Sequence, residues 1–128
     1  MQQAKYLRLY SDEDGDSHFE DFEVPLVPVD FAPPAASLKI AQFLPATQTL
    51  WLGAQVGWAG EEPHPSPLRQ IFCFVQGNFE VTASDGDVRA FPVGSVLLLE
   101  DTTGKGHSTR VTSQGDGLIF AVVLADPD

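Results

Sequence analysis

The sequence predicts an all-β fold in a single domain. Ten prolines and eleven glycines are spread along the 128 residues, and few stretches keep a helical spacing of apolar residues over three turns. Short β-prone segments recur instead at intervals of roughly eight to twelve residues, with turn residues between them, which is typical of a sandwich or barrel. A chain of this length fits one domain with its own core.

Eight segments are expected to be strands, and the pair Asp85-Gly86 predicts a two-residue hairpin. The segments are 5–10, 49–58, 69–77, 78–84, 85–91, 94–100, 107–113 and 117–125. Residues 24–38 contain four prolines and are expected to form an extended arm outside the barrel, because proline donates no ladder hydrogen bond. We therefore assign residues 1–44 to a terminal strand, an acidic loop and this arm, and residues 45–125 to the barrel.

Charge and composition limit the partners and the location. The net charge of −11 argues against duplex nucleic acid and against an anionic membrane surface, because both would repel the protein. Cys73 is the only cysteine, so an intramolecular disulfide is impossible, and its apolar neighbours favour a buried, inert thiol. The start of the chain lacks the apolar core of a signal peptide, and no run is long enough to span a membrane. We expect a soluble, cytoplasmic protein.

The acidic stretch 11–23 shares the ligand spacing of a calcium-binding loop. Its acids fall at positions 1, 3, 5, 9 and 12 of an EF-hand loop, namely Asp12, Asp14, Asp16, Glu20 and Glu23. Ser17 occupies the position that needs glycine, however, and the flanks do not resemble helices. A solvated acidic loop is favoured, and a weak calcium site without EF-hand architecture stays open.

Two motifs carry a family resemblance. The spacing of His64, Ser66, Gln70 and Gly77 resembles the first motif of the cupin superfamily, His-x-His-x3-Glu-x6-Gly, with serine and glutamine in place of the second histidine and the glutamate. Residues 91–111, "FPVGSVLLLEDTTGKGHSTRV", resemble the second motif, which ends here in His107. The resemblance implies a cupin-like jelly-roll β-barrel whose two motif hairpins line one mouth. It also implies a homodimer built by strand exchange or sheet extension.

The second motif departs from the family pattern at three places. Glu100 stands where proline is usual, the loop before His107 is about two residues longer, and the later asparagine is Val111. The glycine-rich loop 102–106 lacks the frame of a phosphate loop and is expected to be a flexible flap beside His107.

Alternation along the strands predicts which side chains enter the barrel. If Gln70 points inward, Phe72 and Phe74 do too, and His107 shares its face with Thr109 and Val111. Arg69 and Arg110 then face outward and are expected to pair with acids. Trp51 and Trp58 are placed on opposite faces of one strand, and Trp58 is the one assigned to the pocket. The predicted ligand-binding residues are Trp58, His64, Gln70, Phe72, Phe74 and His107.

The chemistry of these residues predicts at most a weak metal site. Cupins that hold iron, manganese, nickel or zinc usually present three histidines and one carboxylate, and imidazole and carboxylate are strong ligands for such ions. Here His64, Gln70 and His107 offer two imidazoles and a neutral amide, which suits a loosely bound divalent metal (Zn, Ni, Mn or Fe) or none. Asp101 or Glu100 could add a carboxylate if the longer loop folds inward. The simplest alternative is that both histidines only hydrogen-bond at the rim.

Two classes of function remain open. The protein is predicted to be a non-catalytic binding or sensing protein for a small molecule. The alternative is a small isomerase, epimerase or lyase acting on a sugar-like or carboxylate metabolite, with His64 or His107 as general base.

Overall fold

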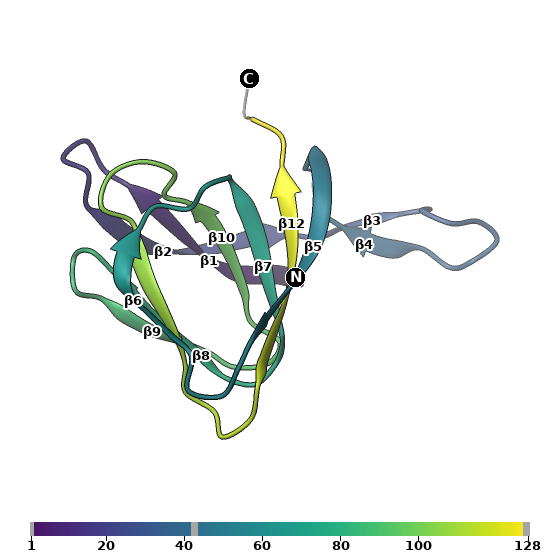
Figure 1. Cartoon of the computed structure of the whole chain (residues 1–128). Coiled ribbons are helices and arrows are strands. Elements are labelled where there is room, and N and C mark those ends of the chain that lie inside the picture. Colours follow the sequence, from purple (N-terminus) through teal and green to yellow (C-terminus); the bar gives the residue numbers. More distant parts are fainter. Residues whose placement is uncertain (1, 42–43, 127–128) are drawn as a thin grey trace.

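The computed structural model describes residues 2–41 and 44–126, and in those ranges it is built from strands without helices (Figure 1). The strands are β1 (Gln3–Ser11), β2 (Ser17–Pro25), β3 (Val27–Val29), β4 (Leu38–Ile40), β5 (Ala46–Ala54), β6 (Ala59–His64), β7 (Gln70–Gln76), β8 (Phe79–Ala83), β9 (Val88–Phe91), β10 (Val96–Glu100), β11 (His107–Val111) and β12 (Gly117–Leu124). The all-β prediction is confirmed.

Two sheets form the body of the molecule. One has six strands in the order β2-β1-β10-β7-β12-β5, and the other has four in the order β6-β11-β8-β9. From β5 onward the chain passes repeatedly from one sheet to the other. All pairings are antiparallel except that of β1 with β10, which is parallel.

The core lies between these sheets. The six-stranded sheet contributes Leu9, Leu97 and Phe74, and the four-stranded sheet contributes Phe79 and Phe91. The Phe74 ring packs at 5.0 Å from that of Phe91 and 5.3 Å from that of Phe79, measured between centroids. Each such side chain contributes about 1.5–3 kcal/mol on burial, so this aromatic cluster is a main source of attraction between the sheets.

The charge of the stretch 11–23 predicted a solvated loop, and this prediction is wrong. The stretch forms a turn followed by a strand. Strand β2 begins at Ser17 and pairs with β1 along its whole length. Phe19 and Phe22 are partly buried, whereas Glu20 and Asp21 between them are exposed. Acidic side chains are tolerated on the solvent-exposed face of an edge strand. The acids of β2 therefore masked the apolar alternation that would have predicted the strand. The terminal segment therefore belongs to the larger sheet.

The proline-rich segment is an arm, as predicted, with a small sheet of its own. Strands β3 and β4 pair only with each other, and this hairpin projects from the body past β5 (Figure 1). Its apolar side chains are exposed, among them Val27 at 55%, Phe31 at 54% and Leu38 at 52%.

The prediction of one strand over residues 49–58 is wrong. Strand β5 ends at Ala54, a turn follows in which the Trp58 amide donates to the Gln55 carbonyl at 2.9 Å, and β6 begins at Ala59. Gly57 in this turn has a φ of +80°, a conformation that glycine adopts without strain. Trp51 and Trp58 consequently belong to different elements, and alternation along one strand does not relate them.

Close approach of the backbone fixes the position of Gly106, just before β11. Its φ is +72°, and a Cβ there would overlap the carbonyl group of His64 and the nitrogen of Pro65. The residue allows β11 to pair with β6 where His107 lies opposite His64.

We expect Gly106→Ala to destabilise the protein far more than Gly86→Ala. Both glycines have positive φ, but a Cβ at Gly86 would meet nothing within 4 Å. The conformational cost of about 1–2 kcal/mol is shared, so the difference in free energy of unfolding measures the backbone clash at Gly106. Equal urea midpoints for the two variants would contradict this account.

Candidate functional site

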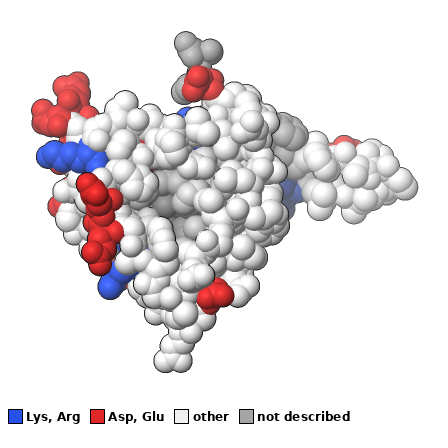
Figure 2. Space-filling view, in the orientation of Figure 1, with Lys and Arg blue, Asp and Glu red and all other residues white. Residues whose placement is uncertain are grey.

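A pocket of about 580 Å³ opens between the sheets, a size suited to a small organic molecule. Its lining comes mainly from β5, β7, β11, β12 and the segment after β6. The lining residues are Gln48, Thr49, Leu50, Leu52, Gly53, Ala54, Trp58, His64, Ser66, Pro67, Leu68, Gln70, Phe72, Leu99, His107, Thr109, Ile119 and Val123. Figure 2 shows a hollow in this face, surrounded by residues without charge, while Lys, Arg, Asp and Glu gather mainly toward the edges.

Pairing of β6 with β11 brings the two motif histidines together. His64 and His107 are direct cross-strand partners, and their ring centroids lie 5.3 Å apart. His64 is exposed at the rim, whereas His107 is only 5% exposed. The two histidines thus occupy an outer and an inner position on one wall.

A buried carboxylate holds the inner histidine. Asp101 is fully buried, and its Oδ2 lies 2.6 Å from His107 Nδ1. Since an ionised carboxylate only accepts hydrogen bonds, Nδ1 carries the hydrogen, and in the neutral form of the ring Nε2 is left as an acceptor or base. The segment after β10 therefore places a carboxylate inward, but behind His107 rather than in the pocket lining.

Gln70 and Ser66 complete the polar end. The Gln70 side-chain amide donates to Ser66 Oγ at 3.1 Å, and Ser66 Oγ donates to the Leu68 carbonyl at 2.6 Å. The Ser66 backbone amide donates to the Asp101 carbonyl at 2.9 Å. Ser66 and Gln70 are thus bonded to each other, which fixes the amide and the hydroxyl.

The remaining predicted residues divide between pocket and core. Trp58 and Phe72 line the pocket, but Phe74 lies below it in the core at 2% exposure and does not line it. Sequence reasoning missed most of the apolar wall, including Leu50, Leu52, Leu68, Leu99, Ile119 and Val123. The two-residue spacing of Leu50 and Leu52 could have predicted that both side chains share the pocket face of one strand.

The basic residues near the site are engaged elsewhere, as expected for Arg69 and Arg110. Arg69 and Arg8 both bind Glu100, and Arg110 binds Glu80. Burial acts to raise the pKa of Glu100, but the hydrogen bonds from the two arginines outweigh it and hold the pKa below its usual value. Glu100 therefore does not reach the pocket as a ligand.

Cys73 is half-buried, not fully buried, and it does not line the pocket. Burial raises the pKa of its thiol, which keeps the sulfur protonated and poorly nucleophilic. The expectation of an unreactive thiol agrees with this environment.

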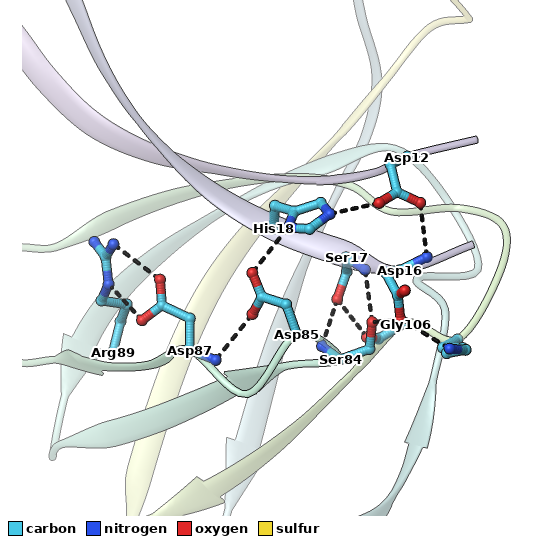
Figure 3. Close-up of polar contacts among 10 residues, drawn as sticks. Asp12, Asp16, Ser17, His18, Ser84, Asp85, Asp87, Arg89 and Gly106 are labelled. Carbon is cyan, nitrogen blue, oxygen red and sulfur yellow. Dashed lines mark hydrogen bonds and ion pairs between the residues drawn. The ribbon is translucent and has the colours of Figure 1, made fainter. Parts of the chain in front are cut away.

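The loop 102–106 is tied to the β1–β2 turn, not a free flap. The Lys105 amide donates to the Gly15 carbonyl at 2.8 Å, and the Lys105 ammonium pairs with Asp16 at 2.9 Å. Ser17 Oγ donates to the Gly106 carbonyl at 2.6 Å (Figure 3). These contacts hold the residues that lead into His107.

The same turn is clamped to the β8–β9 hairpin by His18. Its Nε2 lies 2.6 Å from Asp12 and its Nδ1 lies 2.8 Å from Asp85 (Figure 3). Hydrogen bonds to Asp12 and then to Asp85 raise the pKa of His18, and the hydrogen bond from His18 lowers the pKa of Asp12. Asp12 also accepts from the amides of Asp14 and Asp16, so these contacts, not an EF-hand, organise the acidic turn.

We expect His18→Gln to lower the melting temperature more at about pH 5.5 than at about pH 9.5, conditions chosen from the ordinary pKa values of Asp and His. Because the pKa of His18 is raised, its contribution is present below the ordinary histidine pKa and disappears as pH rises through the folded value. The lowered pKa of Asp12 makes the same clamp weaken in acid, as that carboxylate takes up a proton.

Repeating the change in an Asp12→Asn, Asp85→Asn background provides the control. There the loss at the lower pH should shrink. An equal loss at both pH values in the native background would show that the ring acts only by packing.

The donor set does not fit a firmly held metal. Within residues 2–41 and 44–126, no group of three or more His, Cys, Asp and Glu side chains is arranged to hold a metal ion. His64, His107 and the Gln70 amide lack a carboxylate among them, because Asp101 is bonded to His107 Nδ1.

Neither models of known families nor curated proteins match this sequence. No helix among the described residues is long and apolar enough to cross a membrane.

Proposed function

We propose that this protein is a cupin-like jelly roll that binds a small molecule in the pocket between its sheets. The strand orders β5-β12-β7-β10 and β6-β11-β8-β9 support this assignment, because two four-stranded sheets that exchange the chain in this way are the architecture of a jelly roll. The single observation that carries the function is the pocket itself, with apolar walls and a few fixed polar groups at one end.

We expect Nile red, an uncharged apolar dye, to bind with a stoichiometry near one per chain. Thr109→Trp should abolish its fluorescence enhancement, because Thr109 lines the pocket and a bulky ring there fills it. Ser108→Trp is the matched control, since Ser108 is the preceding residue of β11 and does not line the pocket. Equal dye binding by the two variants would place the dye elsewhere and contradict the proposal.

An enzymatic role is the second candidate, and the Asp101–His107 contact favours it. A buried carboxylate that bonds Nδ1 of a histidine orients the ring and leaves Nε2 available to accept a proton. Isomerases, epimerases and lyases need such a general base. Mass spectrometry of a metabolite extract would separate the two functions. Depletion of a compound by the native protein but not by His107→Gln indicates turnover, whereas retention without change indicates binding alone.

We also propose a homodimer that forms on the β5 side. Strand β5 is an edge strand, all of its residues except Ala54 are exposed, and residues 46–58 contain no charged side chain. Edge strands usually carry charges or prolines that prevent pairing. The apolar arm projects on this same side (Figure 1), so a two-fold axis beside β5 brings each arm to the other copy. A second copy is the expected occupant, because two chains of net charge −11 repel each other least where their contacting faces carry no charge.

We expect a dimer mass by light scattering at tens of micromolar, and a shift to monomer for the double variant Phe31→Lys, Leu38→Lys on the arm. The double variant Val88→Lys, Val93→Lys is the control, because these valines are also exposed, at 48% and 61%, but lie at and beyond β9 on the other sheet. A monomeric native protein would contradict the proposal, as would an arm variant that remains dimeric.

A further inference from the structure

The polar end of the pocket presents hydrogen-bond acceptors. His64 Nδ1 lies 2.9 Å from the Pro65 carbonyl oxygen, and His107 Nδ1 lies 2.6 Å from Asp101. Both partners accept, so both Nδ1 atoms carry the hydrogen, and in its neutral form each ring presents Nε2 as an acceptor. The pocket therefore lacks a matching donor at the two positions where a ligand would meet imidazole.

Gln70 adds a third acceptor. Its amide nitrogen donates to Ser66 Oγ, which leaves the Oε1 atom to accept. The Ser66 hydroxyl cannot serve the ligand as a donor, because it already donates to the Leu68 carbonyl. A ligand that satisfies this end has to bring its own O–H or N–H groups, since an acceptor buried without a donor costs free energy.

The charge of the site excludes anions. None of the seven lysines and arginines is among the residues that line the pocket, and the buried carboxylate of Asp101 lies behind His107. An anionic ligand would lose its hydration in the pocket without a cation to pair with. The net charge of −11 would repel it as well. The apolar walls likewise offer few partners for the many hydroxyls of a sugar.

We infer that the pocket selects a ligand with an apolar body, at least one O–H or N–H donor and no negative charge. This inference rests on the proposed small-molecule function and narrows it. It excludes the sugar-like and carboxylate metabolites considered from the sequence, because apolar walls leave most sugar hydroxyls without partners and no lysine or arginine lines the pocket to pair with a carboxylate.

Three probes that share one ring system test the inference. They are 2-naphthol, which is neutral and a donor, 2-methoxynaphthalene, which is neutral without a donor, and 2-naphthoate, which is an anion. Dissociation constants from calorimetry at neutral pH are expected to favour 2-naphthol at least tenfold over each of the other two. Equal affinity for the methoxy compound overturns the requirement for a donor, and equal or tighter binding of the naphthoate overturns the exclusion of anions.

A change of charge locates the selectivity in this pocket. Thr109→Arg places a cation on the pocket wall and should raise the affinity for 2-naphthoate relative to 2-naphthol at least tenfold. Ser108→Arg adds the same charge on the same strand outside the lining and should leave the ratio within twofold, with melting curves confirming that both variants fold. Equal ratios in the two variants overturn the inference. If none of the probes and no Nile red binds the native protein, the proposed function fails, whereas probe binding in a different order removes only this inference.

Discussion

The contact between Asp101 and His107 connects three parts of the site. Asp101 follows β10, accepts from the histidine of β11 through its side chain, and accepts from the Ser66 amide through its carbonyl. Withdrawing a carboxylate from water is costly, and removing one partner of such a buried pair typically costs about 3–5 kcal/mol. The orientation of His107 is therefore bound to the position of the segment that carries Ser66 and Gln70. Within the described residues, Asp101 Oδ1 accepts no hydrogen bond, so the stability of this carboxylate depends heavily on its one side-chain partner.

Around this contact the molecule separates charge from the pocket. Glu100 holds Arg8 and Arg69 on the outer side of the six-stranded sheet, while its neighbour Asp101 points inward. This opposition follows from the alternation of side chains along an extended chain. Among the described residues it buries the carboxylate of Asp101 and leaves both arginines outside, which is why the pocket combines acceptor nitrogens with apolar walls and is lined by no lysine or arginine.

Much of the architecture could be read from the sequence, because turn residues and apolar alternation are local signals. Strands β7 to β12 fall in this class, whereas the proximity of His64 and His107 was expected only from the resemblance of the two motifs to the cupin pattern. The β1–β2 hairpin was missed because acids on a solvated face conceal the apolar positions of β2. The turn at Gln55–Trp58 was missed because the apolar residues on both sides of it suit a strand, although Gly57 within it was a local turn signal. Phe74 was assigned to the pocket by alternation alone, which gives the face of a strand but not the depth along it. The buried role of Asp101 depends on how a loop folds back, and no local pattern in the sequence determines that.

The acidic face of β2 has a consequence for how the chain is made. Strand β1 is synthesised before its parallel neighbour β10, with Leu7 beside Leu97, so the whole segment between them must leave the ribosome before that edge is covered. Until then the β1–β2 hairpin exposes unpaired backbone groups of the kind that promote association between nascent chains. The concentration of negative charge in residues 11–23 makes two such hairpins repel each other during this interval. The acids of residues 11–23 would thus reduce association between incompletely synthesised chains.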